Sequence, residues 1–264
     1  MKYSNIILLC VLLFIFIFFL NKTFEGFNNT IITTSDEIKI HCFEGDNIIC
    51  SNLKNTNNWE KHISEKIIEY YKPNSNFIDI GSNYGVHSLY VANYIKSNGY
   101  KGKVFSFEIQ PKIYELFIKN IHENNLNDYI EPHIIGLGNK MEKINAQFIN
   151  DYDHGNNPGG TSILNTGNEH INNNKNNLIE TSVDLNTLDY FNFENVSVIK
   201  MDVEGYELIV LEGSLNTINK NKTVILIEIW EKNINEYKQW IENNMKNYKL
   251  EHISGADYIL LPNE

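Results

Sequence analysis

Acidic side chains follow three short apolar segments of this sequence, at the points where each segment gives way to a helical pattern. Asp79 precedes a glycine-containing turn, Glu108 ends the next apolar segment, and Asp202 ends a later one. Because the carboxyl ends of parallel strands meet at one edge of an open α/β sheet, we expect these side chains to lie near one another. Carboxylates at such an edge bind hydroxyl or cationic groups and transfer protons.

The turn after the first segment reads Asp79-Ile-Gly-Ser-Asn-Tyr-Gly. Gly81 and Gly85 allow the backbone to turn sharply and to pass close to a ligand. Asn83 stands where a dinucleotide-binding turn has its middle glycine, so the turn does not predict a pyrophosphate site. Asp79 instead suits a ligand that presents an ammonium group. A plain strand-to-helix turn is the alternative interpretation.

Two further acidic positions extend this pattern. Glu108 lies about thirty residues after the glycine turn, where an acidic residue accepts hydrogen bonds from ribose hydroxyls. A solvated carboxylate at a strand end is the alternative. The segment Ile199-Lys-Met-Asp-Val-Glu brings Asp202 and Glu204 to the same edge of the sheet.

The elements that must position these residues alternate between apolar strands and amphipathic helices, which predicts an α/β fold with a mostly parallel sheet and helices on both faces. Strands are predicted at 77–80, 104–109, 130–136, 196–202, 224–230 and 256–261, and helices at 59–71, 86–95, 111–124, 206–218 and 234–248. The Asn/Gly-rich stretch 151–177 interrupts this rhythm and is predicted to be a flexible loop, either a functional lid or a disordered segment.

The N-terminal region begins with an apolar segment. Residues 3–20 contain no charge and span about 27 Å as a helix, close to the ~30 Å of a bilayer core. Bulky residues before Asn21 disfavour a cleaved signal peptide, and a helix apolar on every face disfavours a buried core helix. We therefore predict a single-pass membrane anchor. The flanking lysines only slightly favour a cytosolic N-terminus, so the side of the remaining chain stays open.

Residues 21–35 are predicted to be a polar linker, and residues 36–58 an N-terminal hairpin that turns at Gly45-Asp46-Asn47. In such a hairpin Cys42 and Cys50 lie opposite each other. A cross-strand disulfide and a pair of half-buried thiols are both compatible with this placement, and the thiols are favoured.

Composition excludes several function classes. The 264 residues include 22 basic and 33 acidic residues, all 22 basic residues are lysines, and the formal net charge is −11. A protein that binds nucleic acid through its phosphates needs a basic face, so we predict no nucleic-acid partner. The eight histidines show no paired ligand spacing, and we predict no metal site.

The motifs together resemble the FkbM family of S-adenosylmethionine-dependent methyltransferases. The resemblance extends from Trp59 to Leu261 and defines a predicted domain over residues 59–264. It rests on the glycine turn, on Phe107-Glu-Ile-Gln-Pro, on Asp184-x-x-Thr-Leu-Asp and, most specifically, on Lys200-x-Asp-Val-Glu-Gly-x-Glu.

This resemblance implies a Rossmann-like class I methyltransferase fold, with a seven-stranded sheet that carries one antiparallel edge strand. It implies S-adenosyl-L-methionine as cofactor, with its methionine portion at the glycine turn, its ribose at the acidic strand end and its adenine at the following residues. The implied cofactor-binding residues are Asp79, Gly81, Asn83, Gly85, Glu108, Ile109, Gly136 and Leu137.

The family is associated with O-methylation, which requires an aligned acceptor oxygen and a group that removes its proton. Asp202 is the first candidate base, Glu204 the second, and His154, in the Asn/Gly-rich stretch, the third. Asp202 is equally suited to positioning the cofactor, Glu204 to capping the next helix, and His154 to being an ordinary loop residue. Glu207 is interpreted as structural, and Glu228 as a further carboxylate of the acceptor pocket.

The sequence therefore predicts a membrane-anchored S-adenosylmethionine-dependent methyltransferase that modifies a hydroxyl of a glycan or another small hydroxylated acceptor. One alternative is a catalytically inactive member of the same fold, and another is an anchored interaction module. An NAD-dependent oxidoreductase is disfavoured by Asn83. The oligomeric state stays open.

Overall fold

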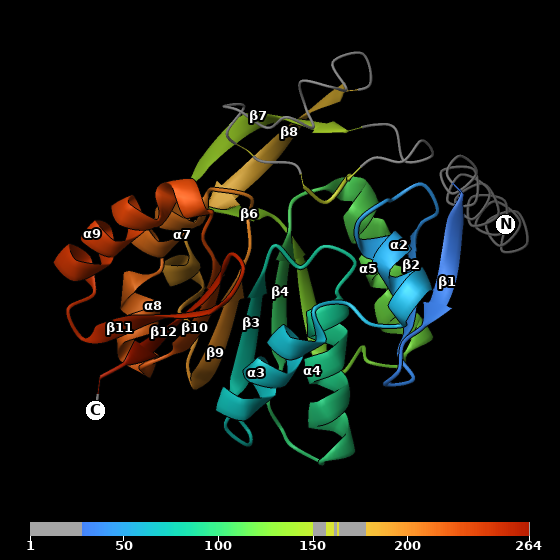
Figure 1. Cartoon of the computed structure of the whole chain (residues 1–264), viewed down its shortest axis with the longest axis horizontal. Helices are drawn as coiled ribbons and strands as arrows, with labels where there is room; N and C mark the ends of the chain where they lie inside the picture. Colours follow the sequence, from blue (N-terminus) through green and yellow to red (C-terminus); the bar gives the residue numbers. More distant parts are fainter. Residues whose placement is uncertain (1–27, 150–156, 161–162, 164–177, 264) are drawn as a thin grey trace, which may run out of the picture.

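The computed structural model describes residues 28–149, 157–160, 163 and 178–263 (Figure 1). Within these residues, no helix combines the length and the apolar character needed to cross a membrane. The predicted anchor at 3–20 and the first part of the predicted linker, 21–27, lie outside the described residues.

The described residues form a central sheet of seven strands. In spatial order these are β11 (Tyr248–Ser254), β12 (Asp257–Pro262), β10 (Val224–Glu228), β9 (Val196–Met201), β3 (Asn76–Ile80), β4 (Val104–Glu108) and β5 (Ile130–Ile134). All neighbours pair in parallel except β12, which is antiparallel to both β10 and β11. The mostly parallel seven-stranded sheet is therefore confirmed.

The position of the antiparallel strand differs from the prediction. β12 lies one place inside the edge, because residues 248–254 form β11 and add a further strand beyond it. The sequence pattern assigned Tyr248 to the end of a helix, but that helix, α9, ends at Asn244. β11 and β12 form a hairpin that turns at Gly255, whose φ of +52° suits a residue without a Cβ.

Helices cover both faces of this sheet, with α3 and α4 in front of it in Figure 1. Alternate residues of each strand face opposite sides: Phe77 packs into one apolar cluster and Ile78 into the other. Helices α2 (Ile49–Thr56), α3 (Lys61–Tyr70), α4 (Val86–Ser97) and α5 (Pro111–Glu123) contribute to the first cluster, and α7 (Glu207–Glu212), α8 (Leu215–Asn221) and α9 (Ile234–Asn244) to the second.

Two short 3₁₀ helices and a smaller sheet complete the domain. The 3₁₀ helices are η1 (Leu188–Phe191) and η2 (Glu231–Asn233), and the sheet has the order β6 (Gly136–Leu137), β8 (Leu178–Asn186) and β7 (Glu142–Ile149). The helix predicted over 206–218 is two helices. Asp189 of η1 starts the second, because its carboxylate accepts the backbone amides of Asn216 and Thr217 at 3.1 and 2.7 Å.

The N-terminal hairpin is shifted from its predicted place. β1 (Asn29–Thr33), inside the predicted linker, pairs with β2 (Lys39–Phe43), and the residues after β2 form α2 instead of a returning strand. Asp46 causes this difference, since its Oδ1 accepts the amides of Ile48 and Ile49 and so starts a helix where a hairpin turn was predicted. A disulfide joins Cys42 to Cys50, whereas the sequence favoured free thiols.

Candidate functional site

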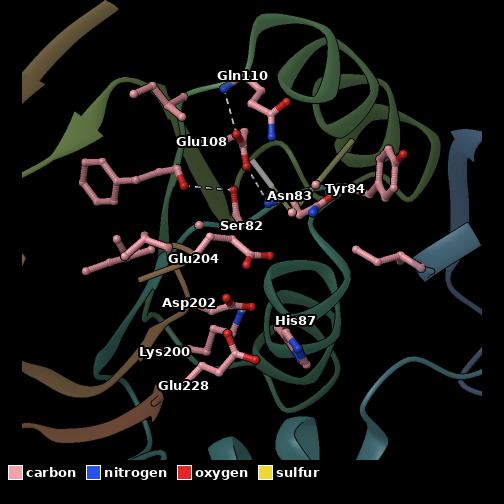
Figure 2. Close-up of a pocket in the computed structure, with 18 of the residues that line it drawn as sticks. Ser82, Asn83, Tyr84, His87, Glu108, Gln110, Lys200, Asp202, Glu204 and Glu228 are labelled. Carbon is pink, nitrogen blue, oxygen red and sulfur yellow. Dashed lines mark hydrogen bonds and ion pairs between the residues drawn. The ribbon is translucent and has the colours of Figure 1, made fainter. Parts of the chain in front are cut away.

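A cavity of about 260 Å³ lies at the carboxyl ends of β3, β4 and β9. Figure 2 shows its wall, from Glu108 and Gln110 at one end to Lys200, Asp202, Glu204 and Glu228 at the other. The site therefore forms at the sheet edge where the sequence placed it. Most of the residues predicted to bind the cofactor or to act in catalysis line this cavity. They are Gly81, Asn83, Glu108, Ile109, Gly136, Leu137, Asp202 and Glu204.

The glycine turn brings the backbone into close contact with the end of β9. Gly81 has φ +79°, and a Cβ built on it would lie 1.8 Å from the backbone oxygen of Asp202. The amide of Asp202 in turn donates to the backbone oxygen of Ile80 at 3.0 Å. Only a glycine permits this approach, which brings the turn and the carboxylates of the third motif into one site.

Glu108 fixes the turn from the neighbouring strand. Its Oε2 accepts the amide of Asn83 and its Oε1 the amide of Gln110, each at 2.8 Å (Figure 2). Burial raises the pKa of Glu108 to about 7, against the lowering effect of these backbone hydrogen bonds. Gln110 donates to the backbone oxygen of Pro158 at 2.8 Å, while its buried Oε1 has no hydrogen-bond partner among the described residues.

Asp79 lies beneath the turn and does not line the cavity. It is fully buried, and its Oδ2 accepts a hydrogen bond from Ser88 of α4 at 2.5 Å. The structure therefore places Asp79 outside the cavity wall, and its contact with a ligand stays a prediction. Gly85 also lies behind the cavity, where a Cβ built on it would lie 2.0 Å from the ring of Phe117.

An ion pair between a buried lysine and a half-buried aspartate lies at the far end of the cavity. Nζ of Lys200 lies 3.0 Å from Oδ2 of Asp202, and Lys200 is only 7% exposed. Burial lowers the pKa of Lys200, but the negative charges of Asp202, Asp79 and Glu60 outweigh this effect and raise it. Lys200 is therefore a buried positive charge that interacts with several carboxylates at this end of the cavity.

Two carboxylates at this end form no hydrogen bond or ion pair with the described residues: Glu204 and Glu228. Burial, followed by the negative charge of Asp202, raises the pKa of Glu204 to about 8. The same two effects raise the pKa of Glu228 to about 9. Glu204 also has φ +56°, a strained conformation for a residue with a side chain.

Glu204 does not cap the next helix, because α7 has no side-chain hydrogen bond at its N-cap; Glu207 instead binds the loop before it. Oε1 of Glu207 accepts the amides of Val203 and Gly205 at 3.1 and 3.0 Å, and its Oε2 accepts the hydroxyl of Tyr237 at 2.7 Å. Glu207 thus holds the loop that carries Glu204, and its side chain is buried away from the cavity.

Sequence reasoning missed several residues of the cavity wall, among them Glu60 and His87. Nε2 of His87 lies 3.2 Å from Oε2 of Glu60, and its Nδ1 lies 2.9 Å from Oγ of Ser64. Burial raises the pKa of Glu60, but the hydrogen bond from His87 and the neighbouring positive charges lower it by more. Glu60 lies outside any strand end, so the pattern that identified the other carboxylates could not identify it.

Two further predictions concern His154 and the absence of a metal site. His154 lies outside the described residues. Among the residues that the structure describes, no group of three or more histidine, cysteine, aspartate or glutamate side chains has a metal-binding arrangement.

Comparison with known proteins places this fold and site in a class. The family description "Methyltransferase FkbM domain" matches residues 79–253, which is more than half of the chain and includes both ends of the cavity. The fold is thus the Rossmann-like methyltransferase fold. The chain belongs to the FkbM methyltransferase family, as the sequence motifs predicted. No curated protein matches the chain.

Solved structures of several methyltransferases are similar to it. The methyltransferase FkbM of Methylobacillus flagellatus KT is 16% identical, with a TM-score of 0.47, over 75% of this chain and 50% of that one. The precorrin-6y C5,15-methyltransferase of Geobacter metallireducens GS-15 is 9% identical, with a TM-score of 0.45, over 77% and 88%. The tRNA m1G37 methyltransferase of M. jannaschii is 14% identical, with a TM-score of 0.44, over 91% and 58%. The chain therefore matches half the length of the first of these proteins.

Proposed function

We propose that this chain is an S-adenosylmethionine-dependent O-methyltransferase that modifies a hydroxyl of a glycan or another small hydroxylated acceptor. We further propose that residues 3–20 hold it at a membrane. The observation that carries the enzymatic proposal is the carboxyl group of Glu204, which has no partner among the described residues and a raised pKa, in the same cavity as the Gly81 turn and Glu108.

The cavity suits the cofactor at the end formed by β3 and β4. Gly81 and its neighbours bring backbone close to the cavity without a side chain, and Glu108 presents a carboxylate for ribose hydroxyls. Oε1 of Gln110, which is buried and has no partner in the described part of the chain, suits a ligand N–H group. Ile109 and Leu137 offer apolar contacts to a planar ring.

When bound, S-adenosylmethionine supplies a methyl group on a positively charged sulfur. The protein must therefore align an acceptor oxygen and take its proton. Glu204 suits the role of base better than Asp202. A carboxyl with a pKa near 8 is protonated below that pH, but its ionised form is a stronger base than an ordinary carboxylate, whereas Asp202 is already paired with Lys200 at 3.0 Å. Asp202 and Lys200 instead form part of the wall at the other end of the cavity, which we assign to the acceptor.

The acceptor end also suits a hydroxylated ligand. Glu60, Glu204 and Glu228 line it, and carboxylate oxygens accept hydrogen bonds from hydroxyl groups. Gly160 brings a further segment to this end, because a Cβ built on it would lie 3.3 Å from Oε1 of Glu204.

Methyl transfer to a panel of monosaccharides tests the proposal. The full-length chain in detergent micelles, supplied with the methyl donor, should release S-adenosylhomocysteine and a methylated sugar, both detected by mass spectrometry. Glu204→Gln should reduce the rate by about 10²–10⁴-fold, the usual contribution of a general base. Glu242→Gln, an exposed change on α9, should leave the rate unchanged. Loss of no more than twofold in Glu204→Gln would contradict the role given to Glu204.

A further inference from the structure

The Cys42–Cys50 disulfide closes a loop that faces the cavity. Cys42 belongs to β2 and Cys50 to α2, and both are fully buried. Ile48 and Ile49, near the end of this loop, are part of the cavity wall. The disulfide therefore connects the N-terminal hairpin directly to the candidate site.

The loop contains two acidic residues, and Asp46 is the buried one, at 2% exposed, whereas Glu44 is exposed. Its Oδ1 accepts the amides of Ile48 and Ile49 at 2.8 and 2.9 Å, and its Oδ2 accepts the hydroxyl of Tyr84 at 2.9 Å. Burial raises the pKa of Asp46 against the lowering effect of these bonds. Such a carboxylate depends on its partners, since a buried polar group without them is costly.

Tyr84 belongs to the glycine turn itself. Its amide donates to Oδ1 of Asn83 at 2.8 Å, and the amide of Asn83 donates to Glu108, also at 2.8 Å. The ring of Tyr84 packs edge-on against Phe43, with ring centroids 6.2 Å apart. A continuous series of contacts therefore leads from the disulfide loop to Glu108, and Figure 2 shows its last three members side by side.

We propose that Asp46 is a positioning residue for the cofactor turn and that the Cys42–Cys50 disulfide holds it in place, so that the oxidised chain binds the cofactor more tightly than the reduced chain. This inference rests on the proposed function. Asp46 touches no cofactor; it acts through the hydroxyl of Tyr84.

The redox step is a simple exchange. Two electrons and two protons from a dithiol convert the disulfide into two thiols, and the dithiol becomes a disulfide. The loop is then no longer closed, so its conformational freedom rises and Asp46 is held less firmly against Tyr84. Because disulfides persist in oxidising compartments, the compartment in which the chain folds would set its cofactor affinity.

Titration calorimetry with S-adenosylhomocysteine tests this inference on the full-length chain. The oxidised protein is compared with protein folded in dithiothreitol and with the Cys42→Ala/Cys50→Ala variant. We expect Kd to increase about tenfold in both, as for the loss of one buried hydrogen bond. Tyr84→Phe should weaken binding similarly. Tyr71→Phe removes another buried tyrosine hydrogen bond, to Ser75 at 2.6 Å, away from the cavity, and should not change Kd.

A double-mutant cycle separates positioning from stability. Tyr84→Phe in the alanine background should weaken binding by less than it does in the oxidised protein, because both changes disturb one contact. An unchanged Kd in the reduced protein and in both variants, with only a lower melting temperature, would overturn the inference.

If the wild-type chain binds no S-adenosylhomocysteine, the proposed function fails first. Hydrogen exchange of the amides of residues 81–85 then tests whether the disulfide loop holds the glycine turn in place. Faster exchange after reduction supports the positioning role, and unchanged exchange contradicts it.

Discussion

Burial and neighbouring negative charges shift the pKa of Lys200 in opposite directions. One ammonium group lies among Asp202, Asp79 and Glu60, and the attraction of these carboxylates outweighs the burial that would otherwise remove its charge. Lys200 and its acidic partners stabilise each other, because each charge is costly to bury alone. The acidic end of the cavity therefore depends on this one lysine.

Replacing Lys200 by methionine should destabilise the protein strongly. The change keeps the side-chain bulk but leaves the carboxylate of Asp202, at 3.0 Å, without its positive partner. We expect the free energy of unfolding in urea to fall by about 1–3 kcal/mol, less than for a fully buried pair, because the side chain of Asp202 is 31% exposed. Lys66→Met, which breaks the exposed pair with Glu69, should cost less than about 0.5 kcal/mol. Equal costs for the two variants would show that Lys200 has no special role.

The raised pKa of Glu228 predicts how stability depends on pH. The folded protein holds this proton up to about pH 9, whereas an unfolded chain releases it near 4.5, so the folded state binds more protons between these values. Stability should therefore fall as the pH rises from about 4.5 to about 9. Glu228→Gln should reduce this slope and raise the melting temperature at pH 9 by about 2–4 °C for each ~1 kcal/mol regained. Melting curves at pH 5, 7 and 9 measure this; parallel curves for variant and wild type would refute it.

The turn between β3 and α4 is the element on which the site depends most. Its backbone passes against β9 at Gly81, where a Cβ would lie 1.8 Å from the oxygen of Asp202. A side chain there must push the turn away from the strand end, in addition to the strain of φ +79°. The same displacement would separate Asn83 from Glu108, since both belong to this edge of the sheet.

Gly81→Ala should therefore abolish binding of S-adenosylhomocysteine and lower the melting temperature by much more than a matched glycine change. Gly99→Ala is the control, because Gly99 has φ +66° but nothing within 4 Å of a built Cβ. We expect Gly99→Ala to cost about 1 kcal/mol from strain alone. Similar melting temperatures for the two variants would contradict the close-contact argument.

At the level of elements, the sequence identified the strands and helices that carry a strong pattern. β3, β4, β9 and β10 are mostly apolar and almost entirely buried; β4, β9 and β10 lie within their predicted ranges, and β3 begins one residue earlier, at Asn76. β11 was missed because Tyr248 also continued the helical spacing of the preceding helix. The hairpin was misplaced because Gly45-Asp46-Asn47 is typical of a turn, whereas the side chain of Asp46 here begins a helix.

Across the whole molecule, the sequence predicted the residues that follow strand ends and missed those that reach the site from elsewhere. Glu108, Asp202 and Glu204 line the cavity, since the topology of a parallel sheet brings strand ends together. Glu60 reaches the cavity from the segment before α3, which no local pattern relates to the sheet edge, and His87 reaches it from the first turn of α4. Asp79 lies in its strand as predicted but is fully buried and does not line the cavity, a difference of depth that spacing does not encode.

The central claim is that the cavity binds the methyl donor, and one titration tests it most directly. S-adenosylhomocysteine, titrated calorimetrically into the full-length chain, should bind with a micromolar Kd, and Glu108→Ala should weaken this binding at least about tenfold through the loss of charged hydrogen bonds. Glu131→Ala, an exposed carboxylate on the neighbouring strand β5, is the matched control and should bind like the wild type. A folded chain that binds no S-adenosylhomocysteine, or a Glu108→Ala variant that binds as tightly as the wild type, would contradict the claim.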